Sequence, residues 1–210
     1  MINTAKGMII EYALSLPPLA VAFEFNPESL TRTRTVSIDS NAMPIIDFLT
    51  PSDANRIAQG ASAAAETISF DILLDATDKL NDRSHPMHAV ATSFGVEPEM
   101  AALRSMLEPK ISGSGPFQVM ASLTGGSRHA HERDEHLSVL LFIWGCHILP
   151  VFITSLTMEE QAHLPTLKPY RAKASISLQV LESDNPFYKV EQVQRMVMSA
   201  ANLLNVPLPF

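Results

Sequence analysis

The sequence predicts a mainly β fold with added helices (β-rich α+β), built around an antiparallel sheet that closes, or nearly closes, into a barrel or sandwich. From Arg171 to Leu181 apolar and polar residues alternate, which is the period of a strand with one buried face. Two apolar runs, residues 139–144 and 147–156, are split by Gly145-Cys146, which indicates a strand pair joined by a tight turn or one long bent strand. The chain also has 15 prolines against 8 glycines, and the prolines divide it into short segments. Many short segments favour short strands and loops over a helical bundle.

Length and charge narrow the class of protein. With 210 residues, we expect one domain over residues 1–182, followed by a C-terminal helix and apolar tail over residues 183–210 that pack on the same domain or on a neighbour. The net charge of -7 argues against a nucleic-acid partner. No apolar run approaches the roughly 18–20 residues that span a bilayer, so direct membrane insertion is not expected. Cys146, the single cysteine, is expected to be a buried core thiol in a protein made in the cytosol.

The first part of the chain reads as paired strands. Residues 8–10 fit a short first strand, and residues 19–25 and 30–38 read as a β-hairpin around the turn Asn26-Pro27-Glu28-Ser29. The second of these strands alternates threonine and arginine, which predicts one polar, cationic face.

The middle of the chain mixes strand and helix signals. Residues 66–75 alternate cleanly and predict a strand with Ile68, Phe70, Ile72 and Leu74 inward. A short helix over 52–59 is possible, residues 60–65 are expected to form a loop, and residues 76–90 a solvated loop. Apolar residues at helical spacing predict helices over 96–107 and 188–205, of which the second is amphipathic and should dock on the protein.

The one metal-like pattern is His129, His131 and His136 in a glycine-containing loop over residues 110–136. Zinc needs three or four ligands that converge on one point, and no rigid element frames these histidines, so a solvated loop is the favoured interpretation. Nucleophile-elbow, phosphate-loop and dinucleotide motifs are absent from the sequence, and we expect no catalytic residues and no cofactor.

Four segments together resemble the N-terminal domain of the contractile injection system tube protein family, the tube-initiator or hub-adaptor proteins of phage-tail-like particles. These segments are Phe23–Ile38 (FEFNPESLTRTRTVSI), Thr67–Asp75 (TISFDILLD), Leu140–Gly145 (LLFIWG) and Pro169–Glu182 (PYRAKASISLQVLE), in the family's order. The chain departs from the family pattern in three ways. The turn over residues 164–170 has no glycine, the 110–136 loop is longer, and residues 186–210 read as a helix and tail where many relatives carry a LysM module.

The resemblance implies a tail-tube β-barrel and a ring of six copies between a trimeric spike protein and the inner tube protein, in contact with other baseplate subunits. It also implies synthesis in the bacterial cytoplasm and a place in an assembled phage-tail-like particle. The leading hypothesis is therefore a structural, non-enzymatic hub or tube-initiator subunit. Two alternatives stay open: a small soluble β-barrel that binds a ligand in an apolar cavity, and a metal-dependent hydrolase that uses the three histidines.

The residues that we expect at subunit interfaces come from the same segments. Trp144 should pack in the barrel interior or at its rim. Arg32 and Arg34 fit a subunit seam or a solvated face, and Arg171 could pair with a neighbour's acid or be an ordinary surface charge. The complete set of interface candidates is Phe25, Asn26, Pro27, Arg32, Arg34, Trp144 and Arg171.

Overall fold

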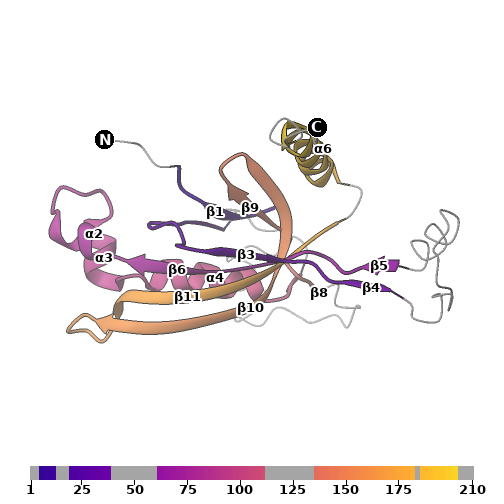
Figure 1. Cartoon of the computed structure of the whole chain (residues 1–210). Coiled ribbons are helices and arrows are strands. Elements are labelled where there is room, and N and C mark those ends of the chain that lie inside the picture. The colour runs from indigo at the N-terminus through magenta and orange to yellow at the C-terminus, as the bar shows by residue number, and fades with distance from the viewer. Residues whose placement is uncertain (1–4, 13–18, 39–60, 112–134, 183–184, 203–210) are drawn as a thin grey trace, which may run out of the picture.

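The fold is β-rich α+β, as expected from the sequence. A computed structural model describes residues 5–12, 19–38, 61–111, 135–182 and 185–202. Seven strands form one curled antiparallel sheet, a half-barrel (Figure 1). In spatial order they are β2 (Ala20–Ala22), β1 (Met8–Glu11), β9 (Leu140–Trp144), β10 (His147–His163), β11 (Pro169–Val180), β6 (Thr67–Asp75) and β3 (Leu30–Thr33).

Two short strand pairs and four helices complete the described structure. The pairs are β4 (Val36–Ile38) with β5 (Ala61–Ala63), and β7 (Lys110–Ile111) with β8 (Glu135–His136). The helices are α2 (Thr77–Asn81), α3 (His88–Phe94), α4 (Glu97–Leu107) and α6 (Pro186–Asn202). None of these helices combines the length and the apolar character needed to cross a membrane. The possible helix over 52–59 and the tail over 206–210 lie outside the described residues.

The strand pair at the centre of the sheet forms as predicted. Gly145 has a φ of 61°, a left-handed conformation that glycine adopts without the steric cost of a Cβ, and it turns β9 back into β10. The second strand is longer than expected, because β10 continues through the polar residues after Leu156 as far as His163. In that extension the side chain of Met158 is partly buried against the apolar core. Side chains therefore still alternate between the core side and the solvent side of the strand, although most residues there are polar.

The predicted hairpin of residues 19–25 with 30–38 is wrong. β2 pairs with β1 and β3 pairs with β6, so the two segments lie at opposite edges of the sheet. The chain between them does span the open side of the half-barrel, where Phe25 forms a bridge with Leu73 of β6. Pairing with strands distant in sequence therefore displaces the local hairpin, and the sheet nearly closes through this connection.

Two predicted loops are also wrong. Residues 61–63 form β5, because Ser62 pairs with Ser37 of β4 and so continues the pairing of β3 with β6. The segment 76–90 contains α2 and the start of α3. Lys79 of α2 forms ion pairs with Glu24 at 3.4 Å and with Glu99 of α4 at 3.0 Å. These ion pairs attach the polar segment 76–90 to the rest of the protein.

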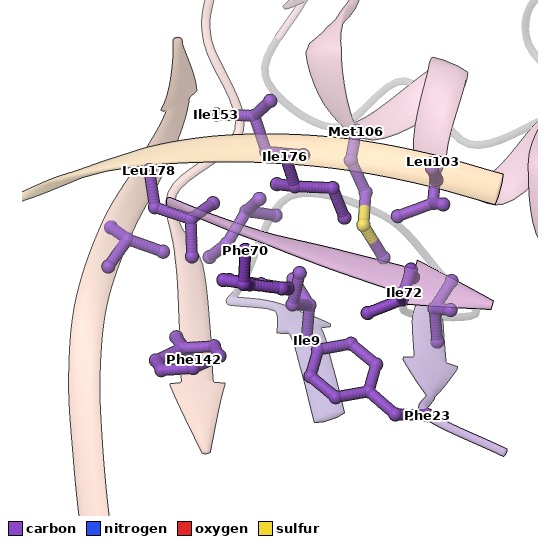
Figure 2. Packing of buried hydrophobic residues seen from close by; sticks show 14 of the residues in the cluster. Ile9, Phe23, Phe70, Ile72, Leu103, Met106, Phe142, Ile153, Ile176 and Leu178 are labelled. Atoms are coloured by element: carbon purple, nitrogen blue, oxygen red, sulfur yellow. The ribbon is translucent and has the colours of Figure 1, made fainter. Parts of the chain in front are cut away.

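The core lies between the sheet and α4, which runs along one face of it (Figure 2). Leu103 and Met106 of α4 point toward the sheet residues Ile72 and Ile176. Aromatic rings fill the other end of the core, where Phe70 and Phe142 stack with ring centroids 5.3 Å apart; Phe23 adjoins both, and all three rings are buried. Each fully buried apolar side chain of this size contributes about 1.5–3 kcal/mol to the hydrophobic driving force.

The turn between α3 and α4 is fastened to the sheet by a close backbone approach. Gly95 has a φ of 60°, and a Cβ at this position would lie 2.0 Å from the carbonyl oxygen of Pro169 at the start of β11. Val96 donates its backbone N–H to that same oxygen at 2.8 Å. Only glycine allows this approach, which orients α4 for its predicted packing on the sheet.

The C-terminal helix forms as predicted, but it docks through an unexpected face. Its buried residues are Tyr188 and Glu191, whereas the apolar residues Val190, Val193 and Val197 are exposed. Cys146 likewise differs from expectation, because it lies exposed in the turn between β9 and β10 rather than in the core.

Candidate functional surfaces

One face of the sheet is lined by hydroxyl groups over four adjacent strands, and we call it the hydroxyl face. The register places Thr31, Ser69, Ser177 and Ser155 in one row across β3, β6, β11 and β10. Ser69 and Ser177 are hydrogen bonded through their Oγ atoms at 3.1 Å. The hydroxyl face consists of Thr31, Thr33, Thr67, Ser69, Ser155, Thr157, Ser175 and Ser177.

Strand alternation separates this face from the core. Ile68, Phe70, Ile176 and Leu178 occupy the intervening positions and are buried. Thr31, Thr33, Ser155 and Thr157 are exposed, and no described helix has its buried residues on this side. The result is a mainly polar surface, on which the half-buried Phe152 lies opposite Gln179 in the strand register.

The charges on the hydroxyl face largely compensate one another. Lys173 pairs with Asp71 at 2.7 Å and is directly opposite Glu159 in the strand register. Hydrogen bonds from Lys173 and then Ser175 lower the pKa of Asp71, although slight burial opposes them. The ionised carboxylate and the ammonium group therefore offset each other, and little net charge is left on this face.

Both edges of the seven-stranded sheet end without a further strand among the described residues. β2 is one edge and β3 is the other, and both are short. An edge strand presents unpaired backbone N–H and C=O groups that can accept a strand from another chain.

The predicted interface residues Phe25, Asn26 and Pro27 lie together beside the edge strand β3. They line a surface hollow of about 510 Å³ whose other wall includes Asp71 and Lys173 of the hydroxyl face. Phe25 is 47% exposed. Asn26 has a structural role, since its Oδ1 accepts the Gly7 N–H at 3.0 Å and its Nδ2 donates to the Ala5 carbonyl at 2.8 Å.

Trp144 lies at the rim of the core, as expected. Its ring stacks on Phe142 with an interplanar angle of 8° and centroids 6.3 Å apart. On its other side it closes over Gly7, where a Cβ would lie 2.6 Å from Trp144 Cε3 and 2.7 Å from Phe23 Cδ2. The indole therefore packs the N-terminal segment against the aromatic core.

A second cluster joins α6 to the end of the sheet through charged groups, and we call it the helix-docking cluster: Arg32, Glu66, His147, Glu191 and Arg195. Glu191 lies between His147 Nδ1 at 2.9 Å and Arg195 Nε at 3.3 Å. Arg195 also reaches Glu66 at 2.7 Å, and Arg32 lies 3.7–3.8 Å from both acids. Glu191 is 1% exposed, so its charge depends on these partners.

Burial and pairing act in opposite directions on the groups of this cluster. Burial raises the pKa of Glu191, but the hydrogen bonds and charges of His147 and Arg195 outweigh burial and hold that pKa below its usual value. Burial lowers the pKa of Arg195, and the charges of Glu66 and Glu191 outweigh it, so the net direction is upward. At neutral pH both groups are charged, and α6 is docked by an ionic cluster.

The remaining predicted interface arginines also pair within the chain. Arg34 binds Glu182 at 2.6 Å, and Glu182 also accepts the backbone N–H of Glu66 at 3.1 Å. Arg171 binds Asp75 at 2.6–2.7 Å. Burial raises the pKa of Asp75, while hydrogen bonds from Thr77 and the ion pair with Arg171 lower it, with a net lowering. These arginines therefore already have acidic partners within the single chain, and their part in an interface stays a prediction.

The histidine site predicted from the sequence falls mostly outside the described part of the chain. His129 and His131 are not described, and His136 is placed only as a backbone position in β8. Within the described ranges, no three His, Cys, Asp or Glu side chains are placed to share a metal ion.

Sequence reasoning missed the acidic half of the helix-docking cluster. Glu66 stands at the start of a predicted strand and Glu191 interrupts a helical pattern, so each looks like an ordinary surface charge. The one available signal was that Glu191 and Arg195 are four residues apart on a helix and so share a face.

A comparison of the sequence with models of known protein families and with curated proteins finds no match.

Proposed function

We propose that this chain is a structural, non-enzymatic subunit of a contractile injection system, and that it forms a six-membered ring which joins a trimeric spike to the inner tube of a phage-tail-like particle. The observation that carries the proposal is the combination of an open half-barrel, two short edge strands and an uncovered hydroxyl face. The motif order over residues 23–182 suggested the same role.

The ring supplies what the isolated half-barrel lacks. Strands β2 and β3 form the two opposite edges of one sheet. A head-to-tail contact between copies therefore brings the β2 edge of one copy to the β3 edge of the next. Such a contact places the sheets of six copies around a common axis. The hydroxyl face then lines the channel, where a polar surface of low net charge would let a passing cargo slide without strong binding.

The chemistry of the described residues suits a structural role. Three of the buried acids, Glu66, Asp75 and Glu191, are each paired with arginine, an arrangement that serves docking rather than proton transfer. The buried Glu11 accepts a hydrogen bond from Ser138 at 2.6 Å. The alternative of a ligand-binding barrel has less support, because aromatic rings fill the core and the 510 Å³ hollow lies open at the edge. The proposed partners are other copies, the spike, the tube and neighbouring baseplate subunits; nucleic acid and membrane insertion are not part of the proposal.

The direct test is co-expression with the spike and tube proteins encoded beside this chain, followed by electron microscopy of the purified complex. A ring of six copies between spike and tube is the expected result. A chain that stays free with all partners present would contradict the proposal.

Edge variants make the test specific to the geometry. Ala20→Lys with Ala22→Lys adds two charges to exposed positions of β2, a change that natural edge strands use to prevent pairing. We expect this variant to fold but to fail in ring assembly. Ala101→Lys, on the exposed side of α4, is the matched control and should assemble normally.

A further inference from the structure

Strand β10 extends beyond its neighbour β9, so that one side of it lacks a partner strand. β9 pairs only with His147–Val151, the beginning of β10. From Phe152 to His163, β10 pairs with β11 on one side, and no described strand pairs with it on the other. β10 is therefore the outer strand of the long β10–β11 hairpin (Figure 1) and a third free edge within the described part of the sheet.

This free edge is regular over only part of its length. The register of β10 is irregular between Ile153 and Ser155 and again between Glu160 and Ala162, whereas from Ser155 to Glu160 each residue pairs one to one with β11. We call Ser155–Glu160 the acceptor edge. At about 3.4 Å per residue it is about 20 Å long, the length of an ordinary strand. The irregularities at both ends limit an added strand to these residues.

Two hydrogen bonds show which backbone groups of β11 face β10. The N–H of Val180 donates to the Glu66 carbonyl beside β6 at 2.8 Å, and the N–H of Leu181 donates to the Pro150 carbonyl of β10 at 2.8 Å. In an antiparallel strand the N–H and C=O groups of successive residues alternate between the two neighbouring strands. The odd-numbered residues of β11 therefore bond to β10.

The same alternation assigns three residues of the acceptor edge to each side. The residues opposite odd-numbered positions of β11, and so bonded to it, are Ser155, Thr157 and Glu159. The residues whose N–H and C=O groups point to the free side are Leu156, Met158 and Glu160. Backbone groups at this spacing specify the occupant, because another extended strand satisfies all of them together.

Charge selects among the strands that could pair here. Glu159 and Glu160 are both exposed, and the acceptor edge contains no lysine or arginine. Arg104 lies 3.9 Å from Glu160 and His163 lies 3.2 Å from it, whereas Glu159 forms no ion pair with any residue that the structure describes. Basic residues on an added strand would be attracted to these carboxylates, and a second copy of the same acidic edge would be repelled.

We propose that the acceptor edge binds an extended segment of a partner protein, with lysine or arginine at alternate positions. Glu159 lies on the hydroxyl face and selects the basic side of this segment. Leu156 and Met158 lie on the core side, where they are partly buried, so apolar residues at the intervening positions would extend the core. The proposed ring seam uses β2 and β3, so this inference goes beyond the proposed function and does not depend on it.

The test is amide hydrogen exchange of the full chain, resolved by residue with NMR. The probe is a capped hexapeptide of alternating lysine and valine, and the matched control peptide has glutamate in place of lysine. In the free chain the three N–H groups on the free side should exchange fast, while the three that bond to β11 are protected. A short strand buries little surface, so we expect a dissociation constant on the order of 0.1 mM and about tenfold slower exchange on the free side at about 1 mM lysine peptide.

Three results of this experiment would overturn the proposal. Protection of the free-side groups in the chain alone would show that the edge is already covered. Unchanged exchange with the lysine peptide would show that the edge accepts no basic strand. Equal protection by the glutamate peptide would show that the carboxylates select nothing.

Charge reversal locates the contact. Glu159→Lys with Glu160→Lys should invert the preference, so that the glutamate peptide slows exchange on the free side and the lysine peptide does not. Glu28→Lys with Asp78→Lys makes the same change in net charge at exposed positions outside β10 and should behave like wild type. Protection of the β6 and β11 amides checks that both variants are folded. A folded acceptor-edge variant that still prefers the lysine peptide would contradict the proposal.

A proline variant separates strand addition from charge attraction. Met158→Pro removes an N–H that is not bonded to β11, so the chain should stay folded, while an added strand loses a hydrogen bond and meets the proline ring. Both carboxylates remain, yet we expect the lysine peptide to give no protection. Met158→Val keeps the N–H and should bind like wild type. Undiminished protection of Leu156 and Glu160 in folded Met158→Pro would show that the peptide does not add as a strand and would overturn the proposal.

Discussion

Glu191 of α6 lies 2.9 Å from His147 at the start of β10, although the two residues are 44 positions apart and Glu191 is only 1% exposed. Arg195 lies against the same carboxylate and extends to Glu66 of the sheet. The C-terminal helix is thus held by charges that the sheet neutralises. This relationship explains how α6 can stay docked while its valines face solvent.

We expect Glu191→Gln to detach α6 from the sheet. Removing one partner of a fully buried ion pair costs about 3–5 kcal/mol, and we expect a smaller loss here because Arg195 keeps Glu66 and the cations are partly exposed. The measurement is hydrogen exchange of the α6 amides, which should become fast while the β6 and β11 amides stay protected. Gln192→Ala, at an exposed position, is the control; protection of α6 that is equal in both variants would contradict the assigned role of Glu191.

Acid should release α6 in the same way. The folded state holds the pKa of Glu191 below its usual value, so its contribution to stability is complete above the pKa of an unfolded glutamate, about 4.3, and is lost as pH falls through the lower folded value. The difference in unfolding free energy between wild type and Glu191→Gln should therefore be largest near neutral pH and shrink below about pH 4. Urea unfolding at a series of pH values measures this difference.

Gly7→Ala should destabilise the protein through Trp144. The added Cβ would lie 2.6 Å from the indole and 2.7 Å from Phe23, so a ring must move, at a cost of about 1–3 kcal/mol for overpacking. The check is a double-mutant cycle with Trp144→Leu, in which the smaller side chain relieves the clash with the indole but not the one with Phe23, so the two changes should be partly non-additive. Strict additivity of the two unfolding free energies would argue against this contact.

Trp144→Ala should cost about 3 kcal/mol, at the low end of the 3–5 kcal/mol range for large-to-small core changes, because the indole is only partly buried at the rim. Thermal or urea unfolding measures the loss. Trp144→Phe retains a ring to stack on Phe142 and should recover part of it.

Asn26→Asp should loosen the N-terminal segment although it changes only one group. The aspartate can still accept the Gly7 N–H, but it can no longer donate to the Ala5 carbonyl, and each such hydrogen bond contributes about 0.5–1.5 kcal/mol. We expect faster hydrogen exchange at Gly7 and Met8, with a larger effect for Asn26→Ala, which loses both bonds. An unchanged exchange rate in Asn26→Ala would contradict the structural role of this amide.

The elements whose pattern is local were predictable. The alternation of residues 66–75 and 171–181 identified both strands and their buried positions, and helical spacing identified α4 and α6. The fold class followed from these patterns. They were predictable because side chains share a face every two residues in a strand and about every 3.6 residues in a helix, so a buried face appears as a repeat of apolar residues in the sequence.

What a strand pairs with is not a local property. Residues 19–25 and 30–38 look like a hairpin, and their separation to opposite edges follows from better pairing with β1 and β6. Cys146 sits in an apolar stretch, yet the turn at Gly145 exposes it.

The sequence by itself thus determined the long strands β6 and β11 with their buried faces, the helices α4 and α6, and the β-rich class of this protein. The tertiary structure alone decided which strands form the edges, which hydroxyls share one face and which face of α6 is buried. The physical reason is that these outcomes depend on contacts between distant segments, such as Arg195 with Glu66, 129 residues apart. Ionic partners from the sheet made the polar side of α6 the buried one and left its valines exposed.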